Sequence, residues 1–118
     1  TSILKSGDRL TKAKERLATL GTEELPQAAI PNYHEFIKFK ETESLFFSAD
    51  LFLSASLARE ESRFDHKRDD FAERDDENWL KWIVFNRDLP NGHRLEELPW
   101  DRYPYQPADL QQVLDKEV

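Results

Sequence analysis

The side chains of this sequence that are best suited to chemistry gather in one charged stretch, residues 61–82, ESRFDHKRDDFAERDDENWLKW. An imidazole with neighbouring carboxylates can perform acid–base chemistry or bind a hard metal ion. The stretch offers His66, Asp69, Asp70, Asp75 and Asp76. Their spacing matches neither HExxH nor a calcium-binding loop. An independent hydrolase or metal enzyme is therefore the weakest alternative, and we assign no catalytic residue and no metal ligand.

The same charges suit a structural joint better. Arg59, Glu61 and Arg63 are expected at the C-terminal end of a long helix, where cations complement the helix dipole. Beyond that end, charged residues of both signs alternate from His66 to Arg74, so an extended segment would point them to one side. This pattern favours docking against a polar surface of another domain, with two tryptophans packed beneath the charges. The predicted docking residues are Arg59, Glu61, Arg63, His66, Arg68, Asp70, Arg74, Trp79 and Trp82.

Three helices are expected to position this stretch. The first, residues 8–20, is amphipathic, with Asp8 as a candidate N-cap and Gly21 as a candidate stop. The second, from about 33 to about 63, contains no Gly or Pro and has a mostly apolar centre. Its apolar stripe is too wide for one neighbour, so we expect it to be covered on more than one side. The third helix is expected over DDENWLKWIVFN, residues 75–86.

These elements predict an all-α fold. We expect a small three-helix bundle, similar to a spectrin repeat, with a long central helix and an extended C-terminal tail. Residues 1–118 are expected to form a single helical domain, with the bundle over about 8–88. The tail, about 89–118, carries prolines interleaved with aromatic residues and is expected to lie on an apolar surface.

Composition argues against several classes of protein. The net charge of −7 argues against nucleic-acid binding, which needs a cationic surface. There is no cysteine, hence no thiol nucleophile and no disulfide. The three glycines, Gly7, Gly21 and Gly92, lie too far apart for a dinucleotide-binding turn, so this chain is expected to bind no cofactor. No window approaches eighteen consecutive apolar residues, and direct membrane insertion is not expected.

The charged stretch resembles the C-terminal helical domain of the fumarate reductase and succinate dehydrogenase flavoprotein family, which includes aspartate oxidase and the adenylylsulfate reductase alpha subunit. The family pattern is Arg-x-Glu-Ser-Arg-Gly-x-His-x-Arg-x-Asp-x-Pro, then Asp-Asp, an aromatic residue and Lys. The matching positions are Arg59, Glu61, Ser62, Arg63, His66, Arg68, Asp70, Asp75, Asp76, Trp79 and Lys81. Phe64 replaces the glycine and Ala72 the proline. That glycine is expected to end the helix in a left-handed conformation, which is unfavourable for Phe.

The resemblance implies a domain that catalyses nothing alone. Its parent would be an FAD-dependent oxidoreductase, with FAD held by a flavin-binding domain of the same chain or of a partner subunit. The charges of the stretch would be paired across the boundary with that domain, near an iron–sulfur subunit. Such a protein is expected in the cytoplasm, or at a membrane through its partner subunits. The alternative left open is a stand-alone helical module that assembles or regulates a flavoprotein.

Overall fold

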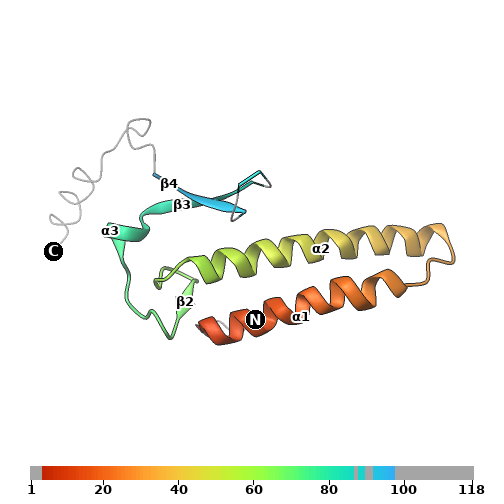
Figure 1. The fold of residues 1–118 in the computed structure, drawn as a ribbon, viewed down its shortest axis with the longest axis horizontal. Coiled ribbons are helices and arrows are strands. Elements are labelled where there is room, and N and C mark those ends of the chain that lie inside the picture. The colour runs from red at the N-terminus through yellow and green to blue at the C-terminus, as the bar shows by residue number, and fades with distance from the viewer. Residues whose placement is uncertain (1–3, 87, 90–91, 98–118) are drawn as a thin grey trace, which may run out of the picture. The chain divides into compact units, whose positions relative to one another are not determined.

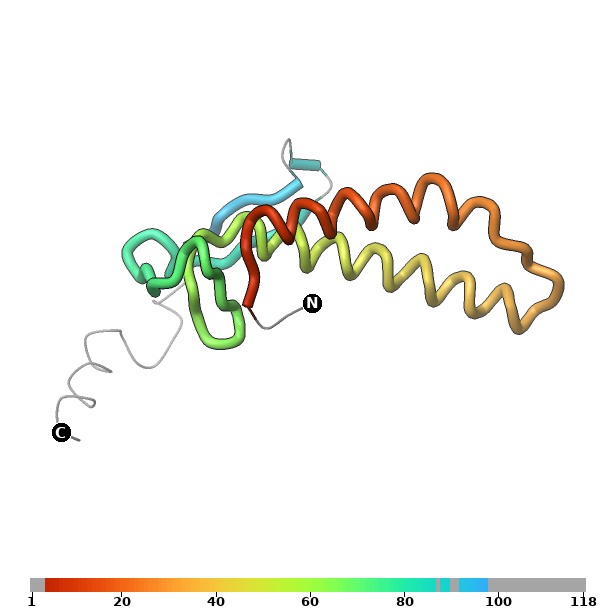
Figure 2. The backbone as a smooth tube through the Cα atoms, turned by 90° about the horizontal axis from the view of Figure 1, so that it is seen from below, coloured from red at the N-terminus to blue at the C-terminus, as the bar shows by residue number. Residues whose placement is uncertain are grey.

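The computed structural model describes residues 4–86, 88–89 and 92–97, and the chain divides into two compact units after Trp79. The first unit is built on a helix pair, α1 (Gly7–Thr19) and α2 (Tyr33–Ala58), which lie side by side in both views (Figure 1, Figure 2). Two short turns connect them, η1 (Leu20–Glu24) and η2 (Leu25–Gln27). The helices are antiparallel, so the end of α2 lies beside the start of α1 (Figure 1).

The interface between α1 and α2 is thinly packed. Among the described residues, Leu10 and Leu53 are the apolar side chains that are fully buried. The ring of Phe46 would lie 3.5 Å from a Cβ added at Gly21, which marks a close approach at the far end of the pair. Lys14 reaches from α1 to Ser54 at 2.6 Å. This pair therefore has a narrow apolar seam, and most of the apolar surface of α2 lies outside it.

The limits of α2 follow from its flanking residues. Pro31 precedes the helix, and the Asn32 side chain accepts a hydrogen bond of 3.0 Å from the backbone N–H of Glu35. This satisfies one of the N–H groups that a helix leaves without a partner. The helix ends at Ala58, and Arg59 is extended with φ −83° and ψ 108°. The sequence predicted a longer helix, to about residue 63, because nothing local signals the earlier end.

Two short elements tie the segment after α2 back to the start of the chain. Strand β1 (Leu4–Lys5) pairs in parallel with β2 (Lys67–Arg68). Helix α3 covers only Asp76–Trp79. The segment between α2 and α3 is therefore held by specific contacts and not by regular secondary structure.

The second unit contains an antiparallel hairpin. Strand β3 (Lys81–Phe85) pairs with β4 (His93–Glu97), in a register that runs from Lys81 opposite Glu97 to Phe85 opposite His93. The predicted helix over residues 75–86 is therefore wrong beyond Trp79. The apolar run WIVF contains two β-branched residues, which fit a pleated sheet and lose side-chain freedom in a helix.

The mostly helical fold with a long central helix is confirmed, and the described residues contain three α-helices. The third is much shorter than predicted, and the small strand pairs were not anticipated. Residues 98–118 of the predicted tail lie outside the described residues. The single-domain organisation over 1–118 stays a prediction.

Removing the cap of α2 tests how much that helix depends on its start. Asn32→Ala should lower the free energy of unfolding by about 1 kcal/mol, because one helix N–H loses its side-chain acceptor. Asn32→Asp keeps an acceptor and should stay close to the wild type. Urea denaturation of both variants checks this, and equal losses in the two would contradict the capping role.

Candidate functional site

Arg68 occupies the centre of the charged loop, which we define as residues 59–76. Its guanidinium is 3% exposed and donates to Asp70 through Nε (2.7 Å) and Nη2 (2.6 Å). Nη1 donates to the carbonyl oxygens of Ser56, Leu57 and Arg59 at 2.8, 3.2 and 3.3 Å. The last carbonyls of a helix lack partners within the helix and favour a cation. Arg68 therefore closes the C-terminal end of α2.

Asp70 connects the same pair to α1. Its Oδ2 accepts a hydrogen bond of 2.8 Å from the backbone N–H of Gly7, the first residue of that helix. A Cβ at Gly7 would lie 3.0 Å from Oδ2, so a larger residue there would push the carboxylate away by a few tenths of an ångström. The guanidinium of Arg68, together with this N–H, holds the pKa of Asp70 well below its usual range. Asp70 in turn raises the pKa of Arg68.

A second network surrounds Glu61, whose side chain is fully buried. Arg63 donates to both of its oxygens, through Nε (2.8 Å) and Nη2 (3.0 Å). The carboxylate also accepts from Arg59 and from the backbone N–H of Asp75. Burial alone would raise the pKa of Glu61, but the hydrogen bonds from Arg63, Asp75 and Arg59 outweigh it and lower the pKa. Glu61 therefore stays ionised within the loop.

The arginines of this network contact both ends of α3. Arg63 also pairs with Asp76, the first residue of α3, and Arg74 bonds the same carboxylate at 2.8 Å. These two arginines lower the pKa of Asp76, with Arg74 the larger cause. At the other end of α3, the Trp79 carbonyl accepts from Arg59 Nη1 at 2.8 Å, and the guanidinium lies 5.5 Å from the indole ring.

His66 is half-buried beside these networks. Its Nε2 lies 3.2 Å from the carbonyl oxygen of Arg59, and burial lowers the pKa of the ring. Ser62 braces the loop from within: its Oγ accepts from the Arg68 backbone N–H at 2.8 Å and lies 2.8 Å from the Phe71 carbonyl oxygen. The buried charges of this loop are thus paired within the chain, and they hold the loop against the ends of α1, α2 and α3.

Apart from Trp79 and Trp82, the predicted docking residues come together in this loop, and Trp79 contacts it from α3 through Arg59. Trp82 lies in β3 of the second unit and is 45% exposed. Sequence reasoning missed Gly7 and Ser62 as contributors. Ser62 belongs to the family pattern and could have been found from it, whereas the role of Gly7 depends on a contact across 63 positions.

Over residues 1–113 the chain matches the family described as "Fumarate reductase flavoprotein C-term". This chain belongs to that family. It is 33% identical over 102 residues to the fumarate reductase flavoprotein subunit of Mycobacterium tuberculosis (strain ATCC 25618 / H37Rv), a match that covers 82% of this chain and 17% of that protein. It is 43% identical over 47 residues to the mitochondrial succinate dehydrogenase (ubiquinone) flavoprotein subunit of Oryza sativa subsp. japonica, covering 40% and 8%. The chain thus spans a minor part of the length of these relatives.

Among the described residues of this flavoprotein C-terminal domain, the glycines are widely separated. Gly7 and Gly21 lie at opposite ends of the first helical segment and Gly92 lies in the second unit, so they form no glycine-rich strand-to-helix turn. Across residues 4–86, 88–89 and 92–97, no group of three or more His, Asp or Glu side chains is placed to hold a metal ion. No helix in these ranges is long and apolar enough to cross a membrane.

Asp70 should make stability depend on pH. Its pKa in the fold lies below the usual value of about 3.9, so its stabilising contribution is complete above that pH and is lost as the pH falls below it. Between about pH 6 and about pH 3, the wild type should lose more free energy of unfolding than Asp70→Asn, which cannot titrate there. Urea denaturation at the two pH values checks this. Parallel losses would contradict the role of the carboxylate.

Glu61→Gln should be strongly destabilising, because Arg59 and Arg63, both largely buried, lose the carboxylate that they share, and only Arg63 keeps another carboxylate partner, Asp76. We expect a loss of about 3–5 kcal/mol in the free energy of unfolding, measured by urea denaturation at neutral pH. Arg74→Ala is the matched control, since it removes a largely exposed pair with Asp76 and should change stability by less than about 1 kcal/mol. Similar effects of the two changes would show that burial is unimportant here.

Proposed function

We propose that this chain is the C-terminal helical domain of a longer FAD-dependent oxidoreductase, which packs on the flavin-binding part of that protein and is not catalytic alone. One observation carries the packing proposal: α2 presents an apolar face on the side away from α1. Membership in a flavoprotein family supports the presence of a flavin-binding part. The oxidoreductase activity would belong to that part and not to this chain.

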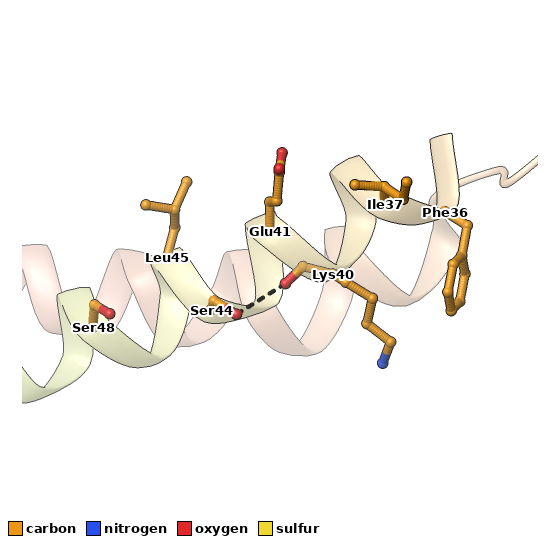
Figure 3. A pocket seen from close by; sticks show the side chains of 7 residues that line it. All are labelled: Phe36, Ile37, Lys40, Glu41, Ser44, Leu45 and Ser48. Carbon is orange, nitrogen blue, oxygen red and sulfur yellow. Dashed lines mark hydrogen bonds between the residues drawn. The ribbon is translucent and has the colours of Figure 1, made fainter. Parts of the chain in front are cut away.

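The outer face of α2, as we call it, is a groove of about 620 Å³ lined by Phe36, Ile37, Lys40, Glu41, Ser44, Leu45 and Ser48 (Figure 3). Phe46 lies close to Gly21 of η1, and Asp50 pairs with Lys14 of α1, so these two positions mark the side of α2 that faces the first helical segment. Ser44 is two residues before Phe46 and Ser48 is two residues before Asp50, and a step of two residues turns by about 200° around a helix. The groove therefore faces away from α1.

The groove has the chemistry of a surface that is covered in the complete protein. Leu45 is 69% exposed and Ile37 is 42% exposed, and both project from one side of α2 (Figure 3). Ser44 donates its hydroxyl to the Lys40 carbonyl oxygen at 3.1 Å, so this polar group is satisfied within the helix (Figure 3). Small side chains such as Ser48 let a partner approach the helix closely. Contiguous exposed apolar surface of this kind marks an interaction site.

The charged loop would support this docking by holding the helix ends in place. Glu61 and Arg68 are buried, so they would act by holding the ends of α1, α2 and α3 in place. Arg74 and Asp70 are more accessible and could contact the partner surface directly. Their pairs fix geometry more surely than they add stability, which suits a joint between domains.

The remaining parts of the proposal concern the parent protein. FAD would be held by the flavin-binding part, in the same chain or in a partner subunit. By the resemblance of the charged loop, an iron–sulfur subunit would lie near this domain and receive or supply electrons. The parent would be cytoplasmic, or held at a membrane by partner subunits.

Leu45→Glu in the full-length parent tests the packing. If the outer face of α2 is covered there, an acidic side chain is buried without a partner, and the purified protein should lose most of its flavin or its assembly. Ala18→Glu on the exposed side of α1 is the control and should retain both. Flavin absorbance per polypeptide, together with the intact mass of the native chain, provides the measurement. Full flavin content in Leu45→Glu, or a native chain of only this length without flavin, would overturn the proposal.

A further inference from the structure

In the turn formed by Phe64 and Asp65, an aromatic residue occupies a position that is unfavourable for it. The backbone of Arg63 and His66 exchanges two hydrogen bonds, of 2.7 and 2.8 Å, which close a two-residue turn. Phe64 has φ 49°, in the left-handed region that disfavours residues with a Cβ. Its side chain is also 83% exposed. An aromatic residue is therefore placed where both the backbone and the ring are unfavourable.

The family glycine at this position was expected to end the helix in a left-handed conformation. Phe64 has a left-handed φ but does not end the helix, because α2 ends at Ala58 and Phe64 belongs to a tight turn beyond it. The first position of a two-residue turn with positive φ is one where glycine is favoured, and the family pattern has glycine there. Phe64 thus departs from both the local rule and the family pattern.

Contacts on both sides hold the Phe64–Asp65 turn in place. Arg63 is held on Glu61 and Asp76, and the Lys5 ammonium lies 3.3 Å from the carbonyl oxygen of Asp65. His66 is held against Arg59. An aromatic ring on a rigid mount loses little conformational freedom when it binds, which is typical of residues that dominate interfaces.

The surface beside the ring can receive a partner. A hollow of about 290 Å³ adjoins Phe64, with Leu4 and Ala72 as apolar lining and with Arg63, Lys67, Arg68 and Asp69 as charged lining. Apolar surface bordered by charges of both signs is common in protein interfaces. Asp69 in the lining and the net charge of −7 argue against a nucleic-acid partner.

We propose that Phe64 is an aromatic anchor that inserts into an apolar pocket on the flavin-binding part of the same polypeptide. The inference rests on the function proposed above and adds a second docking point, separate from the outer face of α2. The match to the Mycobacterium tuberculosis relative covers 17% of that protein, so the remaining chain offers by far the largest surface. A partner in the same polypeptide also needs little affinity, because its effective concentration is high.

Substituting Phe64 separates anchoring from strain by the sign of the effect. Phe64→Gly and Phe64→Asn relieve the left-handed strain, so strain alone would stabilise the protein. As an anchor, the ring contributes more than the strain removes, and both variants should destabilise the full-length, flavin-loaded parent. We expect flavin release on heating to begin several degrees lower, and amide hydrogen exchange over residues 62–72 to rise about tenfold. Ile30→Gly, which removes an exposed apolar side chain from another loop, should leave both unchanged.

The identity of the partner surface is tested by cross-linking. A photoreactive benzoylphenylalanine at position 64 should cross-link to the flavin-binding part of the same polypeptide, mapped by mass spectrometry. Cross-links only to a second copy or to a separate subunit would overturn the inference, as would release temperatures for Phe64→Gly equal to or above the wild type. If Leu45→Glu loses flavin while Phe64→Gly keeps it, only the anchor fails. A wild-type parent without flavin overturns both proposals.

Discussion

The bidentate pair between Arg68 and Asp70 is the interaction on which the first unit depends. The arginine lies on the carbonyl end of α2, and the carboxylate accepts from the amide end of α1. Each charge therefore complements the helix pole that it touches, and the two charges neutralise each other between the poles. Arg68 belongs to β2, which pairs with the N-terminal strand β1, so the same contact also holds β1. One ion pair thus sets the relative position of two helix ends and two strands.

The Glu61 network extends this arrangement to α3 and replaces the apolar core that the loop lacks. In the part of the chain that the structure describes, the buried apolar side chains are Leu10 and Leu53, and Glu61 and Arg68 of these networks are buried as well. Burying charge is unfavourable unless every group finds a partner, and in the described ranges no buried side-chain nitrogen or oxygen lacks one. Such a network gains little stability over an apolar core of the same volume. It specifies one conformation, because any displacement leaves a buried charge unpaired.

Periodicity and composition predict the parts of this fold that depend on local pattern. Helix α1 and the start of α2 follow from apolar spacing and from the Pro31–Asn32 boundary. The end of α2 at Ala58 could not be predicted, because Arg68 closes it from ten positions further along the chain. The charged residues of the loop were recognised, but their alternation suggested an extended strand with outward charges, while the observed segment folds its charges onto helix ends and onto one another. The short apolar run at Trp82–Phe85 fits either helix or strand by pattern, and pairing with β4 decides it.

The placement of polar and apolar groups in the first unit differs from what an independent small domain needs. Among its described residues, the ionised Glu61 and Arg68 are buried alongside Leu10 and Leu53, while Leu45, Phe36 and Phe64 face outward. A helix pair of this size gains too little from its own apolar seam to be an effective stand-alone core. Sequences usually agree with the local rules of their fold, and departures concentrate where function requires them. Here the departures lie on the outer face of α2 and at Phe64 within the charged loop, whose buried charges are all paired. Under the function proposed above, both have one physical explanation: the polar loop fixes the helix ends, and a partner covers the apolar surfaces left exposed.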